Sequence, residues 1–229
     1  MKTFFIDKIK SNFGFEMTDH QSGALSKIVE FLFSRDLDSI FLLKGYAGTG
    51  KSSLIGSLVK TMKEFDQKVV LLAPTGRAAK VFSKYANASA LTIHRKIYRQ
   101  KRFSNEPSGF VPVDNLHKDT LFIVDEASMI GNDGVDSFIF GSGRLLDDLI
   151  HYVYSGENCR LLLIGDSAQL PPVGQEYSPA LQEDVLAGFG MTVESSVLTQ
   201  IVRQASDSGI LYNATNIRNA LNEGTTDAY

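Results

Sequence analysis

The 229-residue sequence has little of several features that would define a simple structural class. It has one cysteine, Cys159, so a disulfide framework and a zinc site built from cysteines are both excluded. No apolar run approaches the length of about 18 residues that a membrane helix needs, and the apolar residues 4–6 are followed at once by Asp7 and Lys8, unlike a signal peptide. A lone cysteine fits a reducing compartment. We therefore expect a soluble, cytoplasmic protein.

Charge of one sign is not in excess either. The 23 Lys and Arg are balanced by 26 Asp and Glu, giving a net charge of −3. This excludes a uniformly basic coat for nucleic acid but leaves room for a local basic patch. The four histidines show no metal-ligand spacing, no Ser/His/Asp arrangement is visible, and there is no internal repeat. The length suggests one domain or one and a half.

Short apolar runs alternate with amphipathic stretches along most of the chain. The runs 39–43, 68–73, 120–124, 160–164 and 192–198 predict strands, and the first four lack the alternation of a half-exposed sheet. Helices are predicted after an N-cap at Thr18, at 51–65, 75–85 and 144–154, and near 207–222. This order indicates an α/β fold with a mostly parallel sheet. The irregular stretch 99–118, with Pro107, Gly109 and Pro112, predicts a small inserted hairpin or loop.

A phosphate-binding loop is the first chemical motif. Residues 45–52 match G-x-x-x-x-G-K-[ST], between a predicted strand and a predicted helix, which is the context that the motif requires. Lys51 is expected to reach the β- and γ-phosphates of ATP, and the Ser52 hydroxyl is expected to bind Mg²⁺. The residues expected to contact the nucleotide here are Gly45, Ala47, Gly48, Thr49, Gly50, Lys51, Ser52 and Ser53.

Two carboxylates, Asp125 and Glu126, follow the apolar run 121–124. Ligands bind at the carboxyl edge of an open α/β sheet. Asp125 is therefore expected to hold Mg²⁺ through its water shell, and Glu126 to orient and deprotonate the attacking water. The alternative is a strand end that merely becomes polar at the surface. A Glu directly after the metal-binding Asp favours hydrolysis over nucleotide storage.

Several segments then resemble, in order, the motifs of superfamily 1 DNA helicases of the RecD-like class, which includes the exodeoxyribonuclease V alpha subunit and is related to Pif1 and Dda-type helicases. The matching segments are residues 17–21, 45–52, 73–79, 92–95, 125–129, 165–173 and 198–204. Seven segments in family order are far more specific than a phosphate loop alone. The resemblance implies a RecA-like P-loop NTPase fold.

The resemblance also implies roles that spacing does not give. Gln21 would read the adenine, Gln169 would sense the γ-phosphate and couple it to DNA, and Arg203 would act as an arginine finger on the transferred phosphoryl group. Simpler roles stay open for two of them. Gln169 would otherwise be a loop glutamine bonded to backbone, and Arg203 a member of a surface salt bridge.

A basic segment is the candidate DNA contact. Cations follow phosphates and aromatic rings stack on bases, and residues 95–103 combine Arg95, Lys96, Arg99, Lys101 and Arg102 with aromatic side chains. The resemblance places a strand-separating pin at 99–114, with Phe103 and Phe110 at its tip or flanks. It also places Thr75 and His94 on the backbone of single-stranded DNA, although Thr75 is equally suited to cap a helix. The alternative is an ordinary solvated basic helix end.

These observations predict the motor domain of an ATP-dependent DNA helicase that moves 5′ to 3′, a polarity that comes from the resemblance alone. Residues 1–204 would form a RecA-like domain with a pin-like segment at about 99–118. Residues 205–229 would form a helix leading to a second RecA-like domain that the sequence does not include, so we expect the chain alone to hydrolyse ATP poorly. Subunits of a helicase–nuclease complex would be further partners. The alternative is an ATP-dependent switch that binds a partner and does not unwind DNA.

Overall fold

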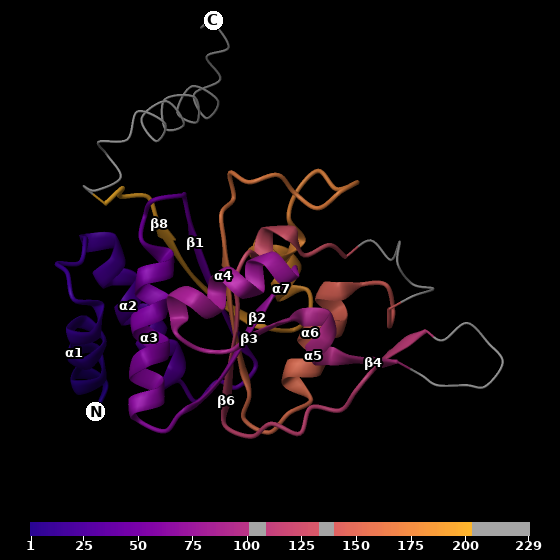
Figure 1. Ribbon diagram of the computed structural model, residues 1–229, viewed down its shortest axis with the longest axis horizontal. Coiled ribbons are helices and arrows are strands. Elements are labelled where there is room, and N and C mark those ends of the chain that lie inside the picture. Colours follow the sequence, from indigo (N-terminus) through magenta and orange to yellow (C-terminus); the bar gives the residue numbers. More distant parts are fainter. Residues whose placement is uncertain (101–108, 133–139, 203–229) are drawn as a thin grey trace, which may run out of the picture.

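The structure, a computed structural model, describes residues 1–100, 109–132 and 140–202 (Figure 1). Its α-helices are α1 Lys2–Phe13, α2 Asp19–Leu32, α3 Lys51–Glu64, α4 Gly76–Ala86, α5 Ile93–Ile97, α6 Leu145–Tyr154 and α7 Glu183–Ala187. Its strands are β1 Ser39–Gly45, β2 Lys68–Ala73, β3 Ala90–Thr92, β4 Tyr98–Gln100, β5 Phe110–Pro112, β6 Thr120–Val124, β7 Arg160–Gly165 and β8 Thr192–Leu198. Two short 3-10 helices cover Ala127–Met129 and Pro179–Leu181.

Six strands form one sheet in the order β3-β2-β6-β7-β1-β8. Every neighbouring pair in it is parallel, so the carboxyl ends of all six strands lie at one edge. The five predicted strands are present, and the predicted parallel α/β fold is confirmed. The short edge strand β3 was not predicted, because three residues carry too little apolar pattern to be recognised.

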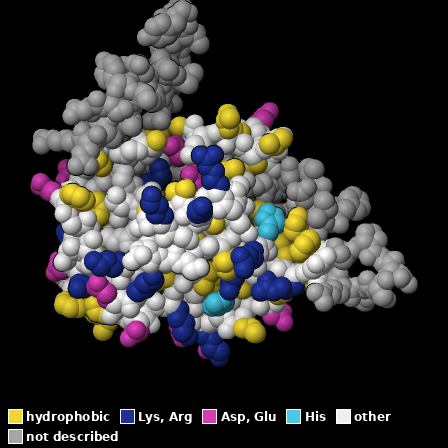
Figure 2. Space-filling model, in the orientation of Figure 1, with side chains coloured by type: hydrophobic (Ala, Val, Ile, Leu, Met, Phe, Trp, Pro, Cys, Tyr) yellow, Lys and Arg dark blue, Asp and Glu magenta, His cyan; other side chains and the backbone are white. Residues whose placement is uncertain are grey.

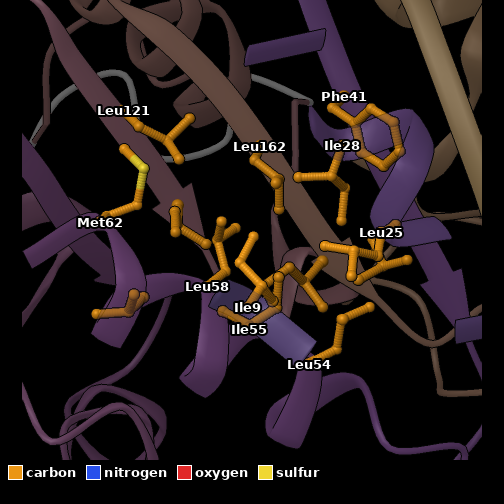
Figure 3. Packing of buried hydrophobic residues seen from close by; sticks show 14 of the residues in the cluster. Ile9, Leu25, Ile28, Phe41, Leu54, Ile55, Leu58, Met62, Leu121 and Leu162 are labelled. Carbon is orange, nitrogen blue, oxygen red and sulfur yellow. The ribbon is translucent and has the colours of Figure 1, made fainter. Parts of the chain in front are cut away.

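Helices cover both faces of the sheet because successive side chains of each buried strand point to opposite sides. Phe41 and Leu43 face a core that α1 to α4 complete. Ile40 and Leu42 face a second core that includes side chains from α5 and α6. Figure 3 shows the first core, in which residues of α1, α2 and α3 pack against β1, β6 and β7. Burial on both faces explains why the strand sequences show no alternation.

Helix α1 was not predicted from the sequence. Phe5 and Ile9, one turn apart, are buried in the first core, and the Asn12 side-chain amide donates to Thr61 Oγ1 at 2.9 Å. The helix ends at Gly14, whose φ of 76° suits glycine. The packing of Phe5 and Ile9 in the first core reveals this helix.

Two threonines cap helices as the sequence indicated. Thr18 Oγ1 accepts from the backbone N–H of Gln21 at 3.3 Å, and Gln21 Oε1 accepts from the backbone N–H of Thr18 at 3.0 Å. The two hydrogen bonds form a capping box. Thr75 Oγ1 accepts from the Ala78 amide at 3.2 Å and caps α4. The cap at Thr75 fixes where α4 starts, directly after β2.

The antiparallel pair β4–β5 lies where the inserted hairpin was predicted (Figure 1). It is smaller than the predicted stretch 99–118, because residues 113–118 belong to no strand and lead to β6. Asn115 in this connection is buried and donates to the Val153 carbonyl at 3.1 Å, which ties the segment to α6 instead of extending the hairpin. The residues that connect β4 to β5, among them Lys101, Arg102 and Phe103, lie outside the described residues. So do Arg203 and the helix predicted near 207–222. In the described part of the chain, no helix is long and apolar enough to cross a membrane.

Candidate nucleotide and nucleic-acid sites

The predicted phosphate loop connects β1 to α3 at the carboxyl edge of the sheet. Gly48 and Gly50 have φ values of 79° and 83°, a region that side chains disfavour. A Cβ on Gly50 would lie 2.3 Å from Gln21 Nε2, and one on Gly45 would lie 2.9 Å from Leu198 Cβ. These glycines therefore serve both the turn and the close packing of β8 and α2 around it.

The Lys51 ammonium lies inside the loop. It hydrogen-bonds to the carbonyl oxygens of Gly45 and, at 2.9 Å, of Tyr46. Lys51 begins α3, with the Gly50 carbonyl accepting the first helical hydrogen bond from Leu54 at 3.0 Å. The positive end of this helix and the ammonium thus face the same space, which suits an anion.

Gln21 joins α2 to the phosphate loop. Its side chain is buried, and its Nε2 donates to the Thr49 carbonyl at 2.9 Å, while its Oε1 completes the capping box at Thr18. Each end of the amide keeps further hydrogen-bonding capacity, since an amide has two donors and two acceptor lone pairs. The recognition of adenine by Gln21 stays a prediction.

Asp125 and Glu126 directly follow β6, beside the phosphate loop. Asp125 Oδ1 accepts from the Glu126 amide at 2.9 Å, and Glu126 has a φ of 55°. A non-glycine residue in this region costs free energy and is often found at functional sites. The turn directs the two carboxylates differently, and both line a cavity of about 510 Å³ with Lys51 and Ser52. We refer to this as the nucleotide cavity.

The carboxyl group of Glu126 is half-buried and surrounded by polar partners. Burial, and then the nearby charge of Asp125, raise the pKa of Glu126, while hydrogen bonding to Gln169 and the charge of Lys51 oppose this rise. Gln169 Oε1 in turn accepts from Ser128 Oγ at 2.8 Å. A carboxylate with a raised pKa is a better proton acceptor at neutral pH. Gln169 is thus bonded to side chains and not to backbone alone.

The sequence analysis missed Tyr85 and Ser128 in this cavity region. Tyr85, on the last turn of α4, donates to Asp125 Oδ2 at 2.7 Å. Ser128 lies in the short 3-10 helix after Glu126 and is fully buried. No motif indicated Tyr85, because its position depends on how α4 packs beside α3.

A second cavity, of about 410 Å³, lies near the predicted DNA contacts Thr75 and His94. Phe140 borders it and is the centre of an aromatic cluster. The ring centroid of Phe140 lies 4.8 Å from that of His94, 4.7 Å from Phe110 and 5.7 Å from Tyr98. Phe110, the first residue of β5, pairs with Gln100 at the end of the hairpin that adjoins the connecting residues, and its ring is stacked on that of Phe140.

The predicted basic residues that the structure describes lie beside this cluster. A third cavity, of about 630 Å³, is lined by the aromatic cluster together with Arg95, Lys96 and Arg99. The Arg99 guanidinium donates to the carbonyl oxygens of Arg95 at 2.9 Å and Tyr98 at 2.8 Å. Figure 2 shows Lys and Arg side chains spread over the face of the molecule that it displays.

Comparison with known proteins agrees with this geometry. A family model described as an AAA domain matches residues 17–229. The ATP-dependent RecD2 DNA helicase of Deinococcus radiodurans is 33% identical over 173 residues, which are 75% of this chain and 21% of that protein. The crystal structure of Pif1 helicase from Candida albicans has a TM-score of 0.53 at 20% identity and covers 90% of this chain and 44% of that chain. Pif1 helicase from Bacteroides in complex with ADP-AlF3 and ssDNA has a TM-score of 0.50 at 19% identity, with 90% and 47% covered.

The chain belongs to the AAA domain family. The predicted relationship to superfamily 1 helicases of the RecD and Pif1 type is confirmed by the RecD2 relative, and the predicted RecA-like fold is confirmed by the two Pif1 structures. The chain spans about a fifth of the RecD2 helicase and less than half of each Pif1 chain.

Proposed function

We propose that this chain is the motor domain of an ATP-dependent DNA helicase that moves 5′ to 3′ along single-stranded DNA. The relatives named above include an ATP-dependent DNA helicase and a Pif1 helicase bound to ADP-AlF3 and ssDNA. Their similarity supports nucleotide binding and single-strand binding by this chain. The lone buried Cys159 suits a reducing compartment and supports our proposal of a cytoplasmic location. Partnership with the subunits of a helicase–nuclease complex stays a prediction.

One observation carries the proposal: two loops contribute side chains to both the nucleotide cavity and the second cavity. The loop after β6 places Asp125 and Glu126 in the first and Met129 in the second. The loop after β7 places Gln169 in the first and Val173 in the second. A change at the γ-phosphate end of the nucleotide would therefore move backbone that also borders the DNA site, which is the coupling that a motor needs.

Magnesium fits the donor set of the nucleotide cavity. Ser52 supplies a hydroxyl and Asp125 a carboxylate, both hard oxygen ligands, and Mg²⁺ usually adds phosphate oxygens and water to such a pair. Among the described residues, no group of three or more His, Cys, Asp or Glu could hold a metal, so the ion would depend on the phosphates of the nucleotide. When bound, Mg²⁺ neutralises charge that develops on the transferred phosphoryl group.

The remaining steps belong to the chain's own residues. Lys51 would leave the loop carbonyl oxygens and bind the β- and γ-phosphates. Glu126 would take a proton from the attacking water, as its raised pKa favours. Gln169, bonded to Glu126 and Ser128, would shift when the γ-phosphate leaves. Arg203 would stabilise the transferred group and, with a second RecA-like domain, complete the site.

On the DNA side, Thr75 and His94 would contact the sugar–phosphate backbone at the second cavity. Arg95, Arg99, Lys101 and Arg102 would follow further phosphates. Phe103 and Phe110, at the tip or flanks of a pin, would separate the strands. The stacking of Phe110 on Phe140 supports this role, because a wedge must resist the force that splits base pairs.

Linkage between nucleotide and DNA tests the proposal. The affinity of the chain for a labelled thymidine oligonucleotide is measured without nucleotide, with ADP, and with ADP plus aluminium fluoride. In a motor domain the nucleotide state changes the affinity for single strands, and the coupling is reciprocal. Lys51→Ala should remove the change and keep binding without nucleotide. Indifference to single strands would instead favour the partner switch. Unwinding of partial duplexes that carry only a 5′ or only a 3′ single-stranded tail tests the polarity.

A further inference from the structure

A tyrosine outside every recognised motif connects the two proposed magnesium ligands. Tyr85 donates from its hydroxyl to Asp125 Oδ2 at 2.7 Å and also hydrogen-bonds to the Ser52 side chain. Ser52 lies on the first turn of α3 and Asp125 follows β6. The phenol of Tyr85, on α4, therefore links α3 to the loop after β6. Tyr85 also lines the nucleotide cavity.

The phenol is held firmly in a protonated state. A tyrosine hydroxyl keeps its proton at neutral pH, and here it donates that proton to Asp125 Oδ2. Its ring stacks on that of Phe82 with centroids 5.0 Å apart, and Phe82 is itself fully buried. A ring that is fixed and a proton that stays in place make Tyr85 a permanent donor to Asp125.

Both oxygens of Asp125 are therefore held by the protein. Oδ1 accepts from the Glu126 amide at 2.9 Å, and Oδ2 accepts from Tyr85. Each carboxylate oxygen has two lone pairs, so one hydrogen bond to each leaves room for a metal or its water shell. Because the single proton of the phenol goes to Asp125, the Ser52 hydroxyl must be the donor in the hydrogen bond between Ser52 and Tyr85. The lone pairs of Ser52 then stay free to bind a cation.

We infer that Tyr85 is a positioning residue that holds Asp125 and Ser52 in the geometry that Mg²⁺ requires. Mg²⁺ demands near-ideal octahedral coordination, so ligands that are already oriented lose less freedom when the ion binds. The inference rests on the proposed nucleotide and magnesium site. It adds a residue that acts on the ion through the two ligands.

The test is the magnesium dependence of nucleotide binding. The chain is titrated with Mg²⁺ at a fixed concentration of a fluorescent ADP analogue, and the affinity for the same analogue is measured in EDTA. Tyr85→Phe removes one hydroxyl and keeps the ring on Phe82. We expect the half-saturating Mg²⁺ concentration to rise about ten- to a hundredfold, the effect of one lost hydrogen bond to a charged group. The affinity in EDTA should stay unchanged.

Tyr154→Phe is the matched control. Tyr154 is half-buried, like Tyr85, and its hydroxyl donates to the Ser39 carbonyl at 2.6 Å, away from the nucleotide cavity. Both variants lose one partly buried hydrogen bond, so both should lower the melting temperature by a similar small amount. Only Tyr85→Phe should change the magnesium titration.

Two outcomes would overturn the inference in different ways. A magnesium titration of Tyr85→Phe that equals that of the unchanged chain, or a lower half-saturating concentration, shows that the hydroxyl has no positioning role or competes with the ion. Nucleotide binding by the unchanged chain that ignores Mg²⁺ overturns the proposed metal site itself, and the role of Tyr85 with it.

Discussion

The nucleotide cavity and the second cavity lie at the same edge of one sheet but are built differently. The first is made largely of backbone turns and a polar network, in which Lys51, Asp125 and Glu126 have partners within the same few loops. The second brings together Thr75, His94 and Phe140, which are far apart in the sequence. A site for phosphate chemistry requires local motifs, whereas a surface for a long flexible ligand can be assembled from distant rings.

Substitutions in the two cavities should act differently. In the nucleotide cavity, a single substitution removes a charge or a proton acceptor that nothing nearby replaces. At the second cavity, several side chains, among them His94, Tyr98 and Phe140, would share the proposed ligand, so each loss would be partial. We expect substitutions in the two cavities to differ in both the size and the kind of their effects.

Glu126→Gln should have the largest effect. It removes the proposed proton acceptor and keeps the shape of the side chain, so ATP turnover should fall about 10²- to 10⁴-fold while nucleotide affinity stays within a few-fold. Phosphate release under single-turnover conditions and calorimetric binding measure the two quantities. Glu16→Gln, at an exposed position, is the control. Equal losses of turnover and affinity would show that Glu126 binds the nucleotide instead of acting on water.

Lys51→Ala should weaken nucleotide binding about 10- to 100-fold, as expected for a lost charged hydrogen bond to phosphate. The fold should persist, because Lys51 belongs to no apolar core. Calorimetry measures the affinity and circular dichroism the folding. Lys60→Ala, at an exposed position on the same helix, removes an equal charge. Unchanged affinity in the Lys51 variant would refute the phosphate loop.

Phe140→Ala should weaken single-strand binding and leave nucleotide affinity unchanged. It removes the ring on which the aromatic cluster converges, and a lost base stack costs about 1–3 kcal/mol. Fluorescence anisotropy with a short oligonucleotide measures the loss. Phe4→Ala, an exposed ring on α1, is the control. If nucleotide affinity falls as much as single-strand affinity, the two cavities do not act as separate sites.

Neutralising Arg99, Lys101 and Arg102 together to Gln should flatten the salt dependence of single-strand binding by up to about three phosphate contacts. The same charge change at Lys2, Lys10 and Lys60 should leave the slope unaltered. Binding isotherms at four or more salt concentrations provide the slopes. Identical slopes of affinity against salt concentration for both triple variants would show that the basic segment does not contact DNA phosphates.

The smallest expected effect is on the pH dependence of turnover. Glu126 acts only when deprotonated, so activity is lost as the pH falls through its pKa, and burial places this loss at a higher pH than for an ordinary glutamate. Gln169→Ala removes the hydrogen bond that opposes the rise in the pKa of Glu126, so turnover should be lost at a still higher pH. A profile of turnover against pH in which the loss moves to lower pH would contradict this electrostatic account.

Much of the nucleotide cavity was predictable because its residues are adjacent in the sequence. The phosphate loop and the pair Asp125–Glu126 each follow a strand, and the alternation of strands with helices indicates a parallel sheet whose strands share one carboxyl edge. The hairpin was predicted from its turn residues, whereas only packing showed that Asn115, in the connection that follows it, binds α6. Tyr85 could not be found, because no pattern along α4 tells which of its side chains reaches Asp125.

The sequence by itself determined the parallel α/β fold, the phosphate loop, the two carboxylates and the family, because each depends on residue types at short, fixed spacings. Only the tertiary structure decided that α1 completes the first core, that Phe140 joins His94 and Phe110, and that Tyr85 links Ser52 to Asp125. These contacts join segments far apart in the chain. Their geometry depends on how the helices pack against the sheet, and local residue patterns carry no record of that packing.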